Sequence, residues 1–181
     1  MLINDDLGGF VRIARNLGMS AFNTREYDFC KLVLDNASSF FSSGNGNLIT
    51  DPLDIDAIAL AETAMVKQTG LDGEPINVSA TWLVVPPQLA ATARGIYLGN
   101  GLIGASSTQP DVNIYAGVYE PKMTPYLSNT SVSSNASETA WYLWSATNKP
   151  YGIAYLNGVE SPVIEETTPD SQYLGRTWRA Y

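Results

Sequence analysis

The chain has 181 residues, 45% of them hydrophobic, which is enough for one globular domain with its own core, and no apolar run approaches the roughly 20 residues that cross a bilayer. Its formal net charge of -8 argues against a surface that grips the phosphate backbone of a nucleic acid. Cys30 is the single cysteine and there is no histidine, which excludes an internal disulfide, a zinc cluster and a catalytic relay built on histidine.

Residues 5–37 are predicted to form a long helix, with Asn4 or Asp5 as its N-cap. Apolar residues recur along it at the i, i+3 and i+4 spacing of one helical face, and Cys30 falls in the same pattern as a small buried side chain. Three glycines weaken this helix by about 1 kcal/mol each relative to alanine, so packing must hold it together. At on the order of 45 Å it exceeds what so small a domain can cover, and we expect it to protrude or to lie across neighbours. The apolar face consists of Leu7, Phe10, Val11, Ala14, Leu17, Ala21, Phe22, Phe29, Leu32 and Val33.

A segment rich in serine, glycine and asparagine, residues 38–50, predicts a loop after the long helix. A second helix is predicted over residues 53–68, with Gly70 as its stop signal. Residues 71–75 then resemble a hairpin turn.

Asp51 and Asp54 are interpreted as capping groups at the start of the second helix. Together with Asp56 they also match the alternate carboxylates of a calcium loop. However, an EF-hand loop that began at Asp54 would need glycine at its sixth position, where Ala59 stands. Helix capping is therefore favoured over a metal site.

The apolar run at residues 82–85 is predicted to be a buried strand that feeds directly into a helix over residues 88–94. The double proline at 86–87 both ends the strand and starts the helix, because proline cannot donate to a sheet ladder but is tolerated in a helix's first turn. Leu83 and Val85 fall on one face of this strand and are expected to fill the core.

Residues 99–104 match the G-x-G-x-x-G fingerprint of dinucleotide-binding proteins letter for letter. That site requires a strand before the motif and a helix after it, so that the pyrophosphate sits on a helix N-terminus. Here a predicted helix precedes the motif. We therefore interpret residues 100–111 as a loop of small and polar residues, and we predict no cofactor.

From residue 112 onward the pattern changes to short strands separated by turn residues, and the chain as a whole is predicted to be α+β. Alternation along one of these strands places Trp141 and Leu143 on one face and Tyr142 and Trp144 on the other. This suits a strand with one face in the core and the other against a loop. The predicted strands cover residues 113–120, 122–127, 140–144, 152–156 and 163–166.

Paired carboxylates of the kind used in glycoside hydrolysis occur at Asp5, Asp6, Glu165 and Glu166. Adjacent residues of an extended strand point to opposite faces, so neither pair can flank one bond by itself. We predict no enzymatic activity and assign no catalytic, cofactor-binding or metal-binding residues. The aromatic strands leave a small carbohydrate-binding or hydrolytic domain as an alternative.

Four motifs carry a resemblance to a known family: INDDLGGF at residues 3–10, the WLVV-PP junction at 82–87, WYLW at 141–144 and LNGVESP at 156–162. In this order they resemble the major capsid protein of tailed bacteriophages. The resemblance implies the Hong Kong 97-type fold, with a long spine helix and a mixed α/β axial domain that packs around the axes of an icosahedral shell. In that fold the loop of residues 100–111 would lie toward the axis of a capsomer.

The resemblance also implies a division into residues 1–50 (spine helix and following loop), 51–166 (axial domain) and 167–181 (start of a returning peripheral strand). It implies a structural subunit of a phage or prophage head, located in the virion and assembled in the bacterial host cytoplasm. The expected partners are copies of itself, as capsomer pentamers and hexamers around packaged DNA, together with scaffold, portal and prohead protease. No sequence-specific nucleic acid binding and no membrane are expected.

In this family an N-terminal arm and an extended loop precede the segment that matches residues 4–8, and further peripheral strands follow the segment that matches 175–181. We therefore expect the chain to lack the N-terminal arm, the extended loop and the C-terminal end, which clasp neighbouring subunits. The same fold leaves an encapsulin-like nanocompartment shell subunit as another alternative.

Overall fold

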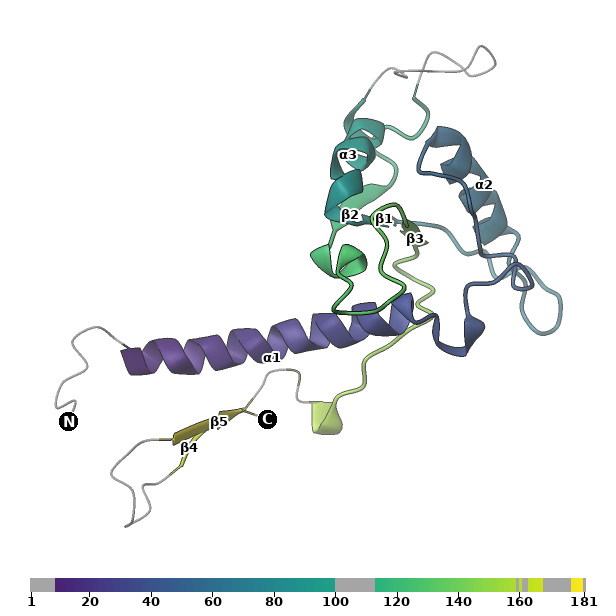
Figure 1. The fold of residues 1–181 in the computed structure, drawn as a ribbon. Helices are drawn as coiled ribbons and strands as arrows, with labels where there is room; N and C mark the ends of the chain where they lie inside the picture. The colour runs from purple at the N-terminus through teal and green to yellow at the C-terminus, as the bar shows by residue number, and fades with distance from the viewer. Residues whose placement is uncertain (1–8, 100–112, 159, 161–162, 168–176, 181) are drawn as a thin grey trace. The chain divides into compact units, whose positions relative to one another are not determined.

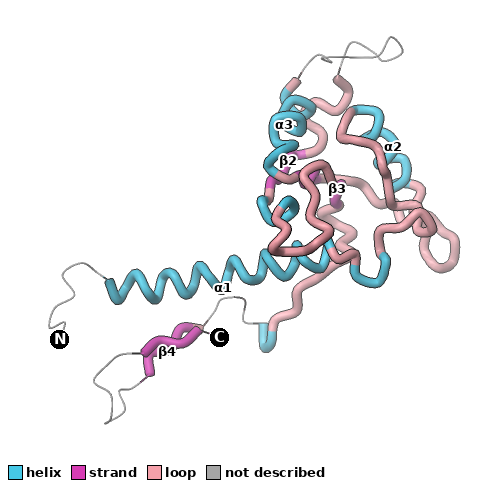
Figure 2. Tube along the Cα trace, viewed as in Figure 1, coloured by secondary structure: helices cyan, strands magenta, loops and turns pink. Residues whose placement is uncertain are grey.

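The computed structural model describes residues 9–99, 113–158, 160, 163–167 and 177–180 (Figure 1). Contacts divide the chain into two compact units, residues 30–151 and a unit made of residues 1–29 with 152–181. In the 30–151 unit, helices and short strands are joined by long loops, as Figure 2 shows. The mixture of helices and small sheets confirms the predicted α+β class.

Helix α1, Gly9–Leu34, is the long purple helix of Figure 1 and confirms the predicted long helix. Its last turn belongs to the 30–151 unit, where Cys30, Val33 and Leu34 are buried. The burial of Cys30 agrees with its interpretation as a small hydrophobic side chain. Asn135 Nδ2 donates to the Leu34 carbonyl at 3.2 Å, which satisfies one of the acceptors that a helix leaves unpaired at its C-terminus.

Helix α1 ends before the predicted residue 37 because Asn36 adopts a left-handed conformation, with φ of 49°. The Asn36 side chain brackets the backbone of Phe41, donating to its carbonyl at 2.9 Å and accepting from its N–H at 2.7 Å. Such side-chain bonds to the backbone compete with helix continuation. The predicted N-cap, Asn4 or Asp5, lies outside the described residues.

The predicted apolar face of α1 is buried only in part. Val33 is 3% exposed, whereas Phe22 and Leu32 are 55% and 39% exposed, which agrees with the expectation that so small a domain does not cover this helix by itself. Ile13 and Met19, which lie off that face, are also exposed, at 49% and 58%. The helix therefore presents apolar side chains to water along much of its length.

A three-stranded sheet lies at the centre of the 30–151 unit, with β1 (Trp82–Val85) between β2 (Glu120–Met123) and β3 (Tyr142–Trp144). Strand β1 runs parallel to β2 and antiparallel to β3. Parallel strands need a crossover, and helix α3, Ala90–Leu98, lies in it. Strand β1 has the predicted bounds, and β3 falls within predicted residues 140–144.

The core is built on one face of β1. Leu83 and Val85 are 1% and 0% exposed and pack with Ile58 of helix α2 (Ile55–Val66) and Ala93 of α3, as the alternation predicts. Because Ala93 is fully buried and small, α3 lies close to the sheet. This face is the main buried apolar surface of the described residues.

The double proline ends β1 and is followed by a helical segment, as predicted, but a short 3₁₀ turn precedes α3. Pro86 continues the extended chain with φ of -71° and ψ of 163°, and a single 3₁₀ turn, Pro87–Leu89, follows it. Helix α3 therefore begins at Ala90 rather than at Gln88, because the prolines first form this tighter turn.

Helix α2, Ile55–Val66, is shorter at both ends than the predicted 53–68. Its start is fixed by the Asp54 carboxylate, which accepts a hydrogen bond from Ala57 N at 2.7 Å. Its end comes before the predicted stop at Gly70. That glycine instead donates its N–H to Glu74 O at 2.8 Å and closes the predicted turn.

The prediction of a strand over residues 113–120 is wrong. Asn113 is buried, and its Nδ2 donates to the carbonyl oxygens of Ile96 and Gly99, at the end of α3, while its Oδ1 accepts from Tyr115 N at 2.9 Å. These bonds hold the segment in turns, and Gly117 follows with φ of 74°. Only the last residue of the predicted strand enters β2.

The predicted strand over residues 122–127 is wrong beyond Met123. Thr124 Oγ1 accepts from Tyr126 N at 3.4 Å and starts the 3₁₀ turn Pro125–Ser128, which ends the strand. Strand β2 also begins earlier than predicted, at Glu120 rather than at residue 122, and therefore includes Pro121. Proline is tolerated there since β2 is an edge strand of this sheet.

The unit formed by residues 1–29 and 152–181 contains a second, two-stranded sheet. Strand β4, Ile164–Thr167, confirms the strand predicted over 163–166 and pairs antiparallel with β5, Thr177–Ala180. The strand predicted over 152–156 is wrong. Positive φ angles at Asn157 and Gly158, 54° and 70°, bend the chain away from an extended path immediately after it.

Candidate functional site

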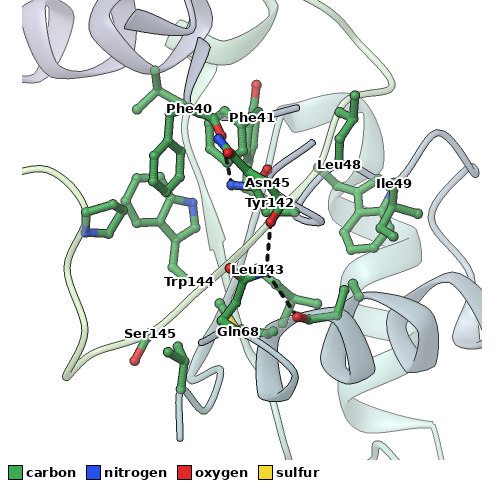
Figure 3. A pocket seen from close by; sticks show the side chains of 18 of the residues that line it. Phe40, Phe41, Asn45, Leu48, Ile49, Gln68, Tyr142, Leu143, Trp144 and Ser145 are labelled. Carbon is green, nitrogen blue, oxygen red and sulfur yellow. Dashed lines mark hydrogen bonds between the residues drawn. The ribbon is translucent and has the colours of Figure 1, made fainter. Parts of the chain in front are cut away.

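The 30–151 unit contains an open cavity of about 1100 Å³ (Figure 3). Its walls come from three parts of the chain that are distant in sequence. They are the loop after α1, the side of α2 that carries Ala61 and Ala64 together with the segment after it that carries Gln68, and the region of β3. We call this cavity the β3 groove.

Aromatic rings form one wall of the β3 groove. The Phe41 and Tyr142 rings lie 5.5 Å apart, and Tyr151 contacts both Phe40 at 5.4 Å and Trp144 at 6.2 Å. Burial raises the pKa of Tyr142 and of Tyr151, so both phenols keep their protons at neutral pH. This wall confirms that Tyr142 and Trp144 face a loop, while Trp141 and Leu143 pack on the core.

Side-chain amides hold the loop that carries Phe40 and Phe41, as Figure 3 shows for Asn45 and Gln68. Asn45 Nδ2 and Asn47 Nδ2 both donate to Phe40 O, at 2.8 and 2.9 Å. Gln68 Nε2, on the segment that follows α2, donates to Asn45 O at 3.1 Å. Because these amide donors are engaged with backbone carbonyls, the surface offered to an occupant is largely apolar.

The charged residues that line the β3 groove within the described part of the chain are Lys149 and Asp51. Lys149 is exposed. The backbone carbonyl of Asp51 accepts from Trp141 Nε1 at 3.1 Å. The groove thus carries no net charge, although the chain as a whole has a charge of -8. It is suited to an apolar segment, to whose acidic neighbours Lys149 offers one exposed cation.

A second polar cluster lies in the core, on α2 and the turns before β2. Tyr115 Oη donates to Glu62 Oε2 at 3.0 Å, and the Tyr115 and Tyr119 rings stack with centroids 5.6 Å apart. Burial, aided by the Glu62 carboxylate, raises the pKa of Tyr115 to about 12 and raises that of Tyr119 as well. A protonated phenol that donates to a carboxylate stabilises the packing of this cluster and does not act as a nucleophile.

The three aspartates considered for calcium have separate positions. Asp54 caps α2 as predicted, Asp56 lies in its first turn, and the Asp51 side chain is exposed and makes no capping bond to α2. The prediction that Asp51 also caps the helix is therefore wrong. Within the described residues, no group of three histidine, cysteine, aspartate or glutamate side chains could hold a metal ion.

The remaining predicted features fall partly outside the described residues. Gly99 ends α3, so a helix does precede the G-x-G-x-x-G match, but residues 100–104 are not among those described. Asp5 and Asp6 are likewise outside. Glu165 and Glu166 are neighbours on β4, opposite Arg179 and Trp178 of β5.

The sequence did not predict the β3 groove itself. The alternation in residues 141–144 predicted the aromatic residues of its wall. The loop that packs against them, within residues 38–50, was predicted only as a turn-rich segment. Among the helices of the described residues, none is long and apolar enough to cross a membrane.

Comparison with protein families decides where this chain belongs. The model of the family described as "Phage capsid protein" matches residues 1–181. The chain belongs to the phage capsid protein family. Comparisons with curated proteins and with solved structures gave no match.

This capsid protein is a structural component of a phage virion, as its motifs predict. The functional surfaces of such a protein are those through which it meets other subunits. The β3 groove and the exposed apolar side chains of α1 are therefore the features to examine for assembly.

Proposed function

We propose that this capsid protein is the major capsid protein of a tailed-phage or prophage head and has the Hong Kong 97-type fold. In this proposal α1 is the spine helix, residues 1–50 and 167–181 belong to the peripheral domain, and residues 51–166 form the axial domain. The compact 30–151 unit supports a discrete axial body, although its bounds differ from those proposed.

The observation that carries the proposal is the exposed apolar surface of α1. Ile13, Met19 and Phe22 are each about half exposed. Helices are marginal in water unless an apolar face is covered, and exposed apolar patches mark interaction sites. Copies of the same chain would cover this surface repeatedly in a closed symmetric shell.

The proposed partners are copies of itself in capsomer pentamers and hexamers, with scaffold, portal and prohead protease during assembly in the host cytoplasm. The role is structural rather than enzymatic. A net charge of -8 is compatible with a wall that faces packaged DNA without gripping it.

Sedimentation velocity over a wide concentration range tests the proposal. The chain is expected to form capsomer-sized species as concentration rises, and a variant with Met19→Glu and Phe22→Glu is expected to stay monomeric. Asn16→Glu with Asn23→Glu adds the same charge at exposed polar positions of the same helix and should leave assembly unchanged. A monomeric parent chain, or equal assembly of both variants, would contradict the proposal.

A further inference from the structure

The turn after α2 displays a fully exposed leucine at its tip. Thr69 and Pro75 pair as an antiparallel bridge, and the Ile76 N–H donates to Gln68 O at 3.0 Å. Leu71 projects from the turn that these bonds close and has no part of its side chain buried. An apolar side chain held in this way on an ordered turn is a ready contact for another surface.

The shape of this turn is fixed before any contact is made. Gly73 N donates to Gly70 O at 3.0 Å, and Gly73 has a φ of 83°, which glycine adopts without strain. Asp72 Oδ1 accepts from Glu74 N at 3.2 Å. Binding would therefore order little additional chain, which lowers its entropic cost.

The β3 groove suits this turn in size and polarity, and one of its two charged residues, Lys149, is opposite in sign to the acidic residues of the turn. At about 1100 Å³ it is larger than the roughly 300–1,000 Å³ of most small-molecule pockets, so it suits a segment of protein. Its wall is largely apolar and would receive Leu71. The acidic neighbours of that leucine, Asp72 and Glu74, would meet exposed Lys149 at the groove.

The tip and the groove of one copy lie on the same region of the molecule. Thr69 and Ile76, which form the stem of the turn, line the groove, while Leu71 points away from it into solvent. We propose that the Leu71 turn of one copy inserts into the β3 groove of a second copy of this chain. This contact rests on the proposed shell function and deepens it by naming one subunit interface.

Because every copy carries both the tip and the groove, each can give and receive one contact. Such a contact gives a two-fold pair where two copies exchange tips, a ring where the rotation between copies closes, and an open filament otherwise. It also predicts a complementation pattern that a contact elsewhere would not produce.

The first test uses two variants that remove different halves of the contact. Leu71→Gln removes the apolar tip, and Ala64→Phe fills the groove from α2; each should weaken self-association by about tenfold or more, as hot-spot truncations do. Leu60→Gln, at an exposed leucine of α2, is the matched control and should associate like the parent. An equimolar mixture of the two variants should regain dimers, because one copy supplies an intact groove and the other an intact tip. Parent-like association of Leu71→Gln, or no dimer in a mixture of folded variants, would overturn the proposal.

The second test does not depend on how well the variants fold. A benzophenone amino acid at position 71 is irradiated in a mixture of ¹⁴N- and ¹⁵N-labelled chains, and cross-linked peptides are identified by mass spectrometry. We expect cross-links between copies of opposite label that reach residues 137–149. Assembly with cross-links only elsewhere, or only within one copy, would overturn this contact and leave the proposed function standing. A chain that stays monomeric at every concentration would overturn both.

Discussion

Val85 has no exposed surface and lies on the core face of the central strand. We expect Val85→Asp to bury a carboxylate without a partner and to cost several kcal/mol, a large part of the roughly 5–15 kcal/mol that stabilises an ordinary domain. Thermal melting followed by circular dichroism measures the loss. Val118→Asp, at a half-exposed valine, is the control and should melt close to the parent. A cooperatively folded Val85→Asp protein with an unchanged Tm would show that β1 is not central.

Tyr115 makes stability sensitive to alkali. Its pKa is raised from 10.0 to about 12 by burial and by Glu62, so above pH 10 the unfolded chain loses this proton while the folded chain keeps it. The unfolded state then binds fewer protons, and the free energy of unfolding falls as pH rises from 10 to 12. Denaturant melts at several pH values should show a shallower fall for Tyr115→Phe. The same variant should lose about 1–2 kcal/mol at neutral pH with its hydrogen bond to Glu62. Parallel pH profiles would contradict this assignment.

At the scale of elements, the start of α2 depends on one side chain. Asp54→Ala removes the acceptor for Ala57 N and should lower the free energy of unfolding by about 0.5–2 kcal/mol. Asp51→Ala makes the same change three residues earlier, where the side chain makes no capping bond to α2, and should have little effect. Urea unfolding of both variants gives the comparison. Equal losses would mean that charge near the helix start, rather than the cap, matters.

The backbone amides of helix α1 should be protected from hydrogen exchange only when neighbouring subunits cover the helix. Its apolar side chains at positions 13, 19 and 22 are exposed, so hydrogen exchange over residues 9–25 is expected to be fast in dilute protein and to slow as concentration rises. The buried last turn, near Cys30, should exchange slowly throughout. Strong protection of residues 9–25 that does not change with concentration in a verified monomer would contradict this expectation.

Sequence reasoning succeeded where local chemistry decides the structure. The double proline at 86–87 ends β1 through properties of proline itself. The Asp54 cap needs only a hydrogen bond from Ala57 N, three residues further along the chain. It failed over residues 113–120, because Asn113 is recruited by the carbonyls of Ile96 and Gly99 at the end of α3. That recruitment depends on the packed structure, which alternation in one segment does not encode.

At the scale of the whole molecule, the sequence motifs were enough to predict the phage capsid family but not its contact surfaces. The β3 groove combines residues from Val33 to Pro150, so no window of sequence contains it. For a related reason, the sequence did not identify what covers the apolar face of α1. A periodic apolar face shows that a helix will be covered, but it does not say whether its own chain or another copy provides the cover.

The most direct test of the shell function is electron cryomicroscopy of particles purified from bacteria that express this chain with its neighbouring coding regions. We expect closed icosahedral shells whose wall contains the chain, with the apolar side chains of α1 covered at contacts between subunits. Soluble monomers, or particles whose wall lacks the chain, would contradict the account.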